Sequence, residues 1–310
     1  MKRPRSVAAP LLSALVLLSA GAAPARVDAM EMAITVDDLP SHGALPLGTT
    51  RLQIAERFIS ALTAAGVPSV YGFVNAHRLA DDPSTAEVLK RWVDAGFLLG
   101  NHTYAHRDLH TSDVQAFEQD IAADEPALQS FMGSRDWHWF RYPFMHEGES
   151  VEKIRAIRAY LHERGYKVAE VTLDFRDYAW SDPYARCVAA GDAQAIASLK
   201  ASYLSSALEA VARGQQAASI LYGRDIKHVL LLHIGALDAL LLPELLEQLT
   251  GQGVHFVSLP EAEEDPAYRD ASEPAPLQGG GLLERRLAAK HLRYPPRVEQ
   301  PREKLSALCR

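Results

Sequence analysis

The feature that most constrains the fold is a regular alternation between short apolar runs and longer amphipathic stretches. The apolar runs are about four to six residues long, a length typical of buried strands. Stretches of about ten to twenty residues with helical spacing separate them. This alternation predicts an α/β architecture with a parallel sheet or barrel. We expect seven strands, over residues 32–36, 69–74, 97–100, 138–142, 168–173, 228–232 and 254–257.

Between these strands the sequence predicts amphipathic helices over residues 51–65, 85–95, 112–131 and 149–164. Glycine is a common C-terminal stop of a helix, and one follows each of these stretches, at Gly66, Gly96, Gly133 and Gly165. The Ala-rich stretch 193–221 predicts one or two further helices before the sixth strand. We expect residues 26–260 to form a single barrel-like domain.

The N-terminus predicts export. A cationic start, an apolar run over residues 8–20 and the small residues Ala23-Pro24-Ala25 are typical of a signal peptide over residues 1–25. The apolar run is shorter than the ~20 residues that cross a bilayer, so a retained anchor is the weaker alternative. We therefore expect an exported protein, periplasmic or extracellular, without a membrane span in the mature chain.

After Leu259 the composition changes to clusters of acidic residues, Pro and Gly. This change predicts a peripheral tail over residues 261–310, with one short helix near 282–291. Two cysteines, Cys187 and Cys309, are compatible with one disulfide in an oxidising compartment or with two free thiols. They are too few for a disulfide framework, so the fold depends on its apolar core.

Charge excludes one class of partner. The chain has 32 Lys and Arg residues against 39 Asp and Glu, which gives a net charge of −7. Proteins that bind nucleic acid through its phosphates need a basic excess, so we expect no nucleic-acid partner. The oligomeric state is left open by the sequence.

Polar residues of catalytic types follow the predicted strands directly. In a parallel sheet or barrel the carboxyl ends of the strands share one rim, so residues far apart in sequence meet there. The residues are Asp37 and Asp38 at the first strand, His102 and His106 at the third, Arg141 at the fourth, Asp174 and Asp177 at the fifth, and His233 at the sixth. We expect these groups to line one site.

Two of these pairs have the composition of a metal site. His102 and His106 are four residues apart, so on a helical turn both imidazoles can reach one ion; with 12 histidines in the chain, such spacing also arises by chance. Adjacent carboxylates at Asp37 and Asp38 repel each other unless a cation or an arginine compensates, or one of them caps a turn. One carboxylate, two imidazoles and open positions for water suit metal-dependent hydrolysis.

The remaining groups fit the proton transfers of such a hydrolysis. A second carboxylate beside the metal can take the proton of the attacking water, and Arg141 can hold that carboxylate in place. His233 is a candidate proton donor to the leaving group if Asp177 orients it. The alternative for His233 is a hydrogen-bonded core residue at the end of a buried strand.

Five stretches of the chain together resemble the motifs of the polysaccharide deacetylases, the NodB-homology group also called carbohydrate esterase family 4. They occur in the family's order and rough spacing, and the match spans residues 31 to about 257. The stretches are Thr35-Val36-Asp37-Asp38, His102-Thr103-Tyr104-Ala105-His106, Arg141-Tyr142-Pro143-Phe144, Asp174-Phe175-Arg176-Asp177-Tyr178 and Leu230-Leu231-Leu232-His233. Each stretch alone is short, but five in order are specific.

The resemblance implies a distorted (β/α) barrel that removes acetyl groups from an N- or O-acetylated glycan or oligosaccharide. It implies a divalent metal, usually zinc or otherwise cobalt, nickel or manganese, bound by Asp38, His102 and His106. The implied catalytic residues are Asp37 as base, Arg141 to orient it, His233 as acid and Asp177 to tune that acid. The implied substrate contacts are the Phe144 amide at the oxyanion and a pocket formed by Tyr178, Trp180 and Leu232.

Three departures from the family pattern bear on the substrate. Leu39-Pro40 stands where the family commonly has Gly, so the loop after the first strand should be stiffer. Tyr178 stands where Trp is frequent, with Trp180 two residues further on. The segment between Asp177 and His233 is long enough to build a lid or to close part of a groove.

Other functions remain open at this point. The same scaffold fits a hydrolase of carbon–nitrogen bonds in a non-sugar amide, or a non-catalytic carbohydrate-binding protein. Two His and one carboxylate also describe an Fe(II) oxygenase, although the unused carboxylate and Arg141 favour hydrolysis. His42, His110 and His146 are extra ligands or solvated loop residues, and Trp137 and Trp139 stack on sugar or pack on a strand.

Overall fold

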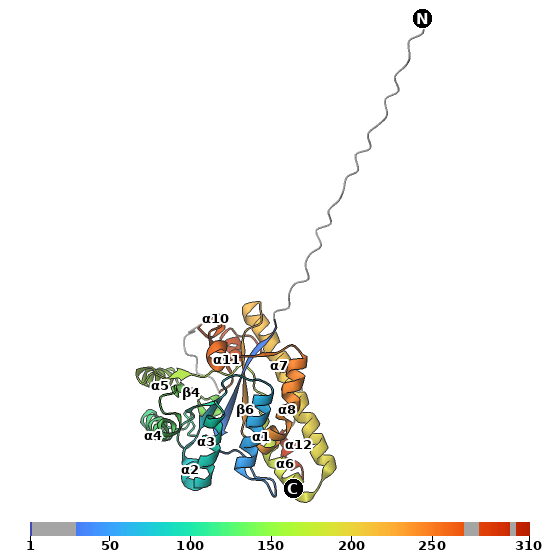
Figure 1. The fold of residues 1–310 in the computed structure, drawn as a ribbon. Helices are drawn as coiled ribbons and strands as arrows, with labels where there is room; N and C mark the ends of the chain where they lie inside the picture. The colour runs from blue at the N-terminus through green and yellow to red at the C-terminus, as the bar shows by residue number, and fades with distance from the viewer. Residues whose placement is uncertain (2–28, 270–278, 298–301) are drawn as a thin grey trace.

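A seven-stranded parallel sheet forms the centre of the computed structural model, which describes Met1 and residues 29–269, 279–297 and 302–310 (Figure 1). The strand order is β5-β4-β3-β2-β1-β6, and β7 pairs with β1 off this path. The strands are β1 (Glu31–Leu39), β2 (Tyr71–Val74), β3 (Leu98–Asn101), β4 (Trp139–Phe140), β5 (Lys167–Val168), β6 (His228–His233) and β7 (His255–Phe256). The expected signal peptide, residues 1–25, lies outside the described residues, apart from Met1.

The segment that follows β5 turns this sheet into a distorted barrel. β5 stands at one end of the strand order and β6 at the other. Five residues after the end of β5, Leu173 forms a parallel bridge with Leu230 of β6, and the Leu231 N–H donates to the Leu173 carbonyl at 3.0 Å. The two ends of the sheet are thereby joined through one short irregular stretch. The expected α/β fold, a single domain with about seven parallel strands, is confirmed.

Helices surround the sheet, with α4 and α5 on one side and α6, α7 and α8 on the other (Figure 1). The α-helices are α1 (Arg51–Ala64), α2 (His77–Asp81), α3 (Ala86–Asp94), α4 (Val114–Met132), α5 (Val151–Glu163), α6 (Ser181–Ala190), α7 (Ala193–Tyr222), α8 (Ala236–Gly251), α9 (Leu259–Glu263), α10 (Pro266–Arg269), α11 (Leu282–Ala289) and α12 (Arg302–Ala307). Three short 3₁₀ helices are η1 (Pro83–Thr85), η2 (Pro143–Met145) and η3 (Asp177–Trp180). In the described residues, no helix combines the length and the apolar character that crossing a membrane requires.

Local side-chain chemistry sets where the long helices begin. Thr50 accepts a hydrogen bond from the Gln53 amide at the start of α1, and the Gln53 side chain accepts from the Thr50 amide in return. The side chains of Asp113, Ser150 and Asp192 likewise each accept a hydrogen bond from a backbone N–H at the start of α4, α5 and α7. Such a cap contributes about 1 kcal/mol to helix stability. These caps place the predicted helix starts within a few residues of the observed ones.

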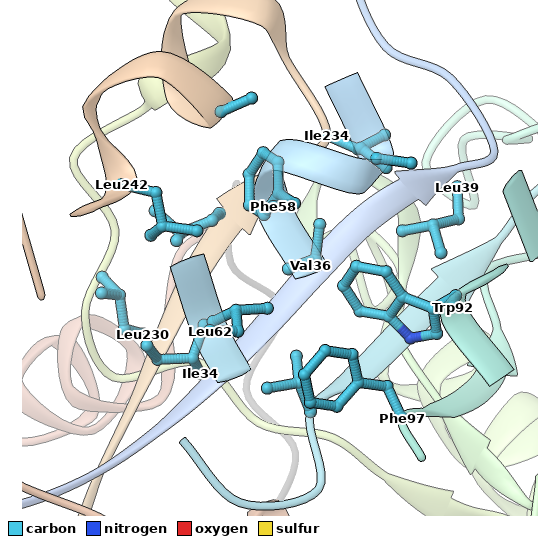
Figure 2. Close-up of a cluster of buried hydrophobic side chains, with 14 of the residues drawn as sticks. Ile34, Val36, Leu39, Phe58, Leu62, Trp92, Phe97, Leu230, Ile234 and Leu242 are labelled. Atoms are coloured by element: carbon cyan, nitrogen blue, oxygen red, sulfur yellow. The ribbon is translucent and has the colours of Figure 1, made fainter. Parts of the chain in front are cut away.

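The apolar core lies between β1 and the helices that cover it. Figure 2 shows Phe58 and Leu62 of α1, Trp92 of α3 and Leu242 of α8 around the apolar side chains of β1. The β1 residues Ile34, Val36 and Leu39 are at most 2% exposed. Full burial of one such side chain contributes about 1.5–3 kcal/mol. The core therefore holds β1, and with it the residues at the end of β1, in a fixed place.

The stretch 193–221 forms most of one 30-residue helix, α7. Two further helices, α6 and α8, were not among the expected elements. α8 buries residues on most of its sides, so it lacks the one-sided apolar pattern by which a surface helix is recognised. α6 and α7 fill much of the interval between Asp177 and His233, and α8 follows His233.

Ion pairs and a disulfide attach the C-terminal segment to the barrel. The Arg285 guanidinium of α11 lies 2.8 Å from Glu147 Oε1 and 2.6 Å from Glu170 Oε2. Cys187 of α6 and Cys309 form a disulfide that links positions 122 residues apart. The pairing of the two cysteines, which the sequence left open, is thus settled. Glu147 lies in the loop after β4, so α11 supports a loop that reaches the candidate site.

Candidate active site

The residues expected at the rim of the barrel lie at the carboxyl ends of the parallel strands. Asp37 and Asp38 lie near the carboxyl end of β1, and His102 follows β3 directly. Arg141 follows β4, and His233 is the last residue of β6. β1 and β6 pair in register with Asp37 opposite His233. The strand ends therefore bring four sequence-distant motifs to one place.

Backbone strain collects in the same loops. Nine non-glycine residues in the described part of the chain have a positive φ, a conformation that disfavours L side chains. Six of them lie at the end of β1 or in the loops around the site: Asp38 (φ 65), Thr103 (φ 61), His106 (φ 52), Phe144 (φ 59), Met145 (φ 54) and Arg176 (φ 62). Strained backbone of this kind persists where the surrounding structure enforces it, and it clusters at functional sites.

Asp38, His102 and His106 form a cluster of three ligand-type groups. Asp38 Oδ1 lies 3.4 Å from His106 Nε2 and 3.7 Å from His102 Nε2. That oxygen is buried and has no hydrogen-bond partner among the described residues. A buried carboxylate oxygen without a partner is costly, and a cation between these three atoms would compensate it. The donor set of one carboxylate and two imidazoles fits zinc.

The protonation of the two histidines also suits metal binding. His102 Nδ1 lies 2.7 Å from the Arg141 carbonyl oxygen, so this nitrogen carries the proton and Nε2 keeps its lone pair. Burial lowers the pKa of His102 to about 4. Burial, followed by the charge of His102, lowers the pKa of His106 to about 4. Both rings are therefore neutral at pH 7, the form in which imidazole binds a metal.

Arg141 distinguishes the two adjacent aspartates. Its Nη1 lies 3.2 Å from Asp37 Oδ1 and 3.3 Å from Asp37 Oδ2. Asp38 is not hydrogen-bonded to Arg141; its Oδ2 pairs with His42 instead. Thr35 and the Ala169 carbonyl fix the rest of the guanidinium. Burial raises the pKa of Asp37, and the charge of Arg141 offsets only part of this effect. A carboxylate with a raised pKa is a better proton acceptor near neutral pH.

His42 contacts the cluster, although the sequence favoured a solvated loop position for it over a role at the site. Its Nδ1 lies 2.7 Å from Asp38 Oδ2, the oxygen that does not face His102 and His106. Burial alone would raise the pKa of Asp38, but the hydrogen bond from His42 and nearby histidine charges hold it well below its usual value. His42 therefore orients the carboxylate. Its position four residues after Asp38 was the available sequence signal.

His233 and Asp177 form a second pair on the other side of Asp37. Asp177 accepts from His233 twice, from Nδ1 at 2.7 Å and from the backbone N–H at 2.5 Å. Burial alone would lower the pKa of His233, but the charge and the hydrogen bond of Asp177 raise it to about 10. His233 is therefore a protonated imidazolium at pH 7, held by an ionised carboxylate.

The residues expected around the substrate occupy two kinds of environment. Phe144 is 54% exposed with its ring 4.5 Å from that of His106, and Tyr178 is 36% exposed with its ring 5.3 Å from that of His233. Trp180 and Leu232 are at most 2% exposed and belong to the apolar core. The Trp180 Nε1–H donates to Ser202 Oγ at 2.9 Å. Phe144 and Tyr178 are thus at the open side, and Trp180 and Leu232 lie behind it.

A second cluster, Asp108, His110 and His146, also brings ligand-type atoms within 4.8 Å of one another. The rings of His110 and His146 stack at 3.9 Å with an angle of 8° between their planes. Lone pairs in two parallel planes do not converge on one ion at the ~2.0–2.1 Å of a zinc–nitrogen bond. His146 Nδ1 instead hydrogen-bonds Asp108 Oδ1 at 2.9 Å. This contact joins the loop after β3 to the loop that carries Phe144.

The two tryptophans near β4 pack rather than face the site. Trp137 and Trp139 are at most 7% exposed. Trp137 stacks on His138, and Trp139 lies beside Tyr71. Both precede or begin β4, whereas the candidate site lies at the other end of that strand.

Comparison with known proteins identifies related sequences for the first half of the chain. Residues 25–169 match the family model for polysaccharide deacetylase. A chitin deacetylase of Arthroderma benhamiae is 25% identical over 160 residues, which make up 46% of this chain and 42% of that protein. The chain thus spans about two fifths of the length of this curated relative. Asp37, Asp38, His102, His106 and Arg141 lie within the matched residues.

Solved structures share the fold. A mutant of a carbohydrate esterase family 4 pseudoenzyme with restored enzymatic activity has a TM-score of 0.52 at 15% identity, over 76% of this chain and 68% of that one. The wild-type pseudoenzyme from Bacillus anthracis has a TM-score of 0.51 at 14% identity, over 76% and 66%. The family 4 domain of a multidomain xylanase from the hindgut metagenome of Trinervitermes trinervoides has 0.50 at 20% identity, over 83% and 99%. At these identities the likeness concerns the distorted barrel alone.

Proposed function

We propose, on the premise that residues 25–169 of this chain belong to the polysaccharide deacetylase family, that the protein is a metal-dependent hydrolase of acetylated carbohydrate. The bond cleaved would be an N- or O-acetyl group on a glycan or oligosaccharide. One observation carries the proposal. The unpartnered Asp38 Oδ1 faces the free Nε2 atoms of His102 and His106, while the neighbouring carboxylate, Asp37, is held by Arg141.

Asp38, His102 and His106 would hold the metal, with zinc the best fit to their donor atoms and cobalt, nickel or manganese as alternatives. A divalent cation at these residues would supply a Lewis acid that acidifies water and polarises the acetyl carbonyl. His42 and the Arg141 carbonyl, each bound to a ligand side chain, would keep the ligands in place.

Asp37 would act as the general base. Its carboxylate lies beside the metal ligands, with Asp37 Oδ2 3.6 Å from His102 Nε2. The proton of the attacking water would pass to this carboxylate, whose raised pKa favours acceptance. Arg141 would keep Asp37 oriented before and after the transfer, because both carboxylate oxygens lie within 3.3 Å of the guanidinium.

His233 would act as the general acid. It is protonated at neutral pH because its pKa is raised to about 10, and its free Nε2 can give a proton to the departing amine or alkoxide. Asp177 would orient the ring through Nδ1. His233 lies on the strand next to Asp37, so base and acid flank the same space from β1 and β6.

The Phe144 amide would bind the oxyanion. Phe144 is the second residue of the one-turn helix η2, and the first recorded amide-to-carbonyl bond of that turn comes from Met145 to Tyr142 at 3.0 Å. An amide at this position is unused by the helix and is available to a developing negative charge. The exposed rings of Phe144 and Tyr178 would contact the sugar on either side.

The same proposal includes export. The disulfide between Cys187 and Cys309 supports an oxidising compartment, in line with the signal peptide expected over residues 1–25. Intact groups at all five motifs favour a catalyst over a non-catalytic binding protein. A hydrolase of a non-sugar amide remains the second candidate, because Tyr178 stands in the pocket where the family frequently has Trp.

Acetate release from a substrate panel tests the proposal. The purified chain, loaded with zinc, would be incubated with chitin oligomers, peptidoglycan-type glycan, acetylated xylan, small acetylated sugars and non-sugar amides. We expect acetate from at least one glycan class and none after the metal is removed with a chelator. No acetate from any carbohydrate at one zinc per chain would contradict the proposal, and turnover of the amides alone would select the second candidate.

A further inference from the structure

A buried carboxyl group that the proposed mechanism does not use lies directly behind the acid pair. Asp238, in the first turn of α8, is 0% exposed, as is Asp177. The Tyr203 hydroxyl of α7 donates to Asp238 Oδ1 at 2.7 Å. The side chains of Asp238 and Asp177 hydrogen-bond each other. A chain of contacts thus runs from Tyr203 through Asp238 and Asp177 to His233.

Two carboxyl groups can hydrogen-bond each other only when one of them carries a proton. Asp177 already accepts from His233 Nδ1 with one oxygen and from the His233 backbone N–H with the other, so it is the ionised member. Asp238 accepts from Tyr203 with Oδ1, and no N–H or O–H group of the described residues donates to its buried Oδ2, as expected for the oxygen that itself carries the proton. The pair therefore shares one proton, which resides on Asp238.

The electrostatic surroundings agree with this assignment. Burial, followed by the charge of Asp177, holds the pKa of Asp238 well above its usual value. Burial alone would raise the pKa of Asp177, but the charge and hydrogen bonds of His233, with the hydrogen bond from Asp238, lower it. A neutral acid next to an ionised one is the arrangement expected when two carboxyl groups are buried together.

The backbone leaves a space for this carboxyl group. A Cβ on Gly235, the residue before α8, would lie 2.1 Å from Asp238 Oδ2. Any residue larger than glycine at position 235 would therefore displace the Asp238 carboxyl group. An aspartate in the first helical turn ordinarily caps the helix or faces its dipole. Asp238 instead turns toward α7 and the end of β6, so capping does not account for it.

We propose that Asp238 is a positioning residue whose protonated carboxyl donates a hydrogen bond to Asp177, and that Tyr203 fixes Asp238 in turn. Through these contacts α7 and α8 set how strongly Asp177 holds His233. The inference rests on the proposed function of His233 as general acid. Without the donor, the full negative charge of Asp177 would act on the imidazolium, which would then hold its proton more tightly and release it less readily to the leaving group.

Three groups of charges and rings face His233 and bear on any measurement of its titration. Asp177 lies on one side, and the carboxylates of Asp37 and Asp38 act across the site. The ring of His42 lies 5.0 Å from that of His233, and the ring of Tyr178 lies 5.3 Å away. Substitutions at Asp238 leave all of these groups in place, which makes Asp238 the cleanest position to vary.

Two substitutions at Asp238 separate the proposal from a merely structural role. In Asp238→Asn, the amide can donate to Asp177 and its oxygen can accept from Tyr203, so the hydrogen-bond pattern of a protonated acid is kept. In Asp238→Leu, a side chain of similar size provides no donor. Tyr203→Phe removes only the outer contact. It serves as the second probe if Asp238→Leu fails to fold.

The His233 ring is followed by NMR of zinc-loaded chain with isotope-labelled histidine, titrated from pH 6 to 11. We expect Asp238→Asn to keep the wild-type His233 pKa and kcat within about twofold. Asp238→Leu should raise the His233 pKa by about 0.5–1 unit and lower kcat about fivefold, the factor that one net hydrogen bond is worth, with KM unchanged. Tyr203→Phe should also raise the His233 pKa and lower kcat, but by smaller amounts than Asp238→Leu.

An unchanged His233 pKa in both Asp238→Leu and Tyr203→Phe would overturn the proposal. So would a loss of the wild-type pKa in Asp238→Asn, because that result would mean an ionised Asp238. The NMR titration needs no turnover. A wild-type chain that releases no acetate but shows the expected pKa shifts would therefore contradict the proposed function while it supports the role of Asp238.

Discussion

Replacing Asp37 with asparagine is expected to lower kcat for acetate release by about 10² to 10⁴-fold, the range that loss of a general base produces. Asparagine has nearly the same shape, and its oxygen can still accept from Arg141 Nη1. It cannot take the proton of the attacking water. Because the metal ligands are Asp38, His102 and His106, zinc content should stay at about one per chain. Acetate release and metal analysis on the same sample give both values.

Asp94→Asn is a matched control for this substitution. Asp94 is an exposed carboxylate whose ion pair is with Lys90. It ends α3, shortly before β3 begins, and therefore lies at the end of the barrel opposite the site. The Asp94→Asn variant should release acetate at the wild-type rate. If Asp37→Asn instead keeps more than about a tenth of the turnover, Asp37 is not the base, and if it loses the metal, Asp37 rather than Asp38 is a ligand.

Replacing His102 with alanine is expected to remove both zinc binding and activity. His102 is 1% exposed and its Nδ1 is already bound to the Arg141 carbonyl, so its Nε2 cannot be replaced by a neighbour. Loss of a supporting contact costs about 10-fold to 100-fold in metal affinity, and loss of a ligand should cost more. Zinc affinity measured against a chromophoric chelator checks this expectation.

Thermal unfolding gives a second readout that does not depend on turnover. A ligand that binds only the folded state raises stability, by about 2.7 kcal/mol at a hundred times its Kd. Zinc should therefore raise the Tm of the wild type but not that of His102→Ala. His162→Ala, at an exposed position near the end of α5, should behave like the wild type. A His102→Ala variant with full zinc affinity would show that the ligand assignment is wrong.

The positions of the strands along the chain, and of all the long helices except α8, could be predicted because their signals are local. Each predicted strand overlaps an observed one, and most differ only at their ends. The largest difference is at the fifth, where pairing as a strand is limited to Lys167–Val168 and the chain continues irregularly to Leu173. That irregular stretch closes the barrel through β6. Such a long-range bridge leaves no periodic trace in the sequence.

The meeting of Asp37, Asp38, His102, Arg141 and His233 followed from the topology of parallel strands, whose carboxyl ends share one rim. What topology could not provide is which oxygen faces which nitrogen. The contact of both Asp37 oxygens with Arg141, and the unpartnered Asp38 Oδ1, separate the two aspartates only once side-chain positions are known.

Two long-range contacts had no usable sequence signal. Tyr203 and Asp238 are 35 residues apart and meet because α7 and α8 pack together. Asp238 alone reads as an ordinary first-turn aspartate of a Leu-rich helix. The Cys187–Cys309 pair spans 122 residues, and two cysteines by themselves do not fix whether they bond. Such pairs depend on tertiary packing rather than on local pattern.

Anomalous X-ray diffraction at the zinc edge, on crystals of the chain grown with zinc, would locate the bound cation without recourse to activity. We predict one strong peak that lies about 2.0–2.2 Å from an Asp38 oxygen and from the Nε2 atoms of His102 and His106. A principal peak at Asp108, His110 and His146, or no peak beside Asp38 at saturating zinc, would contradict the assignment of the metal ligands.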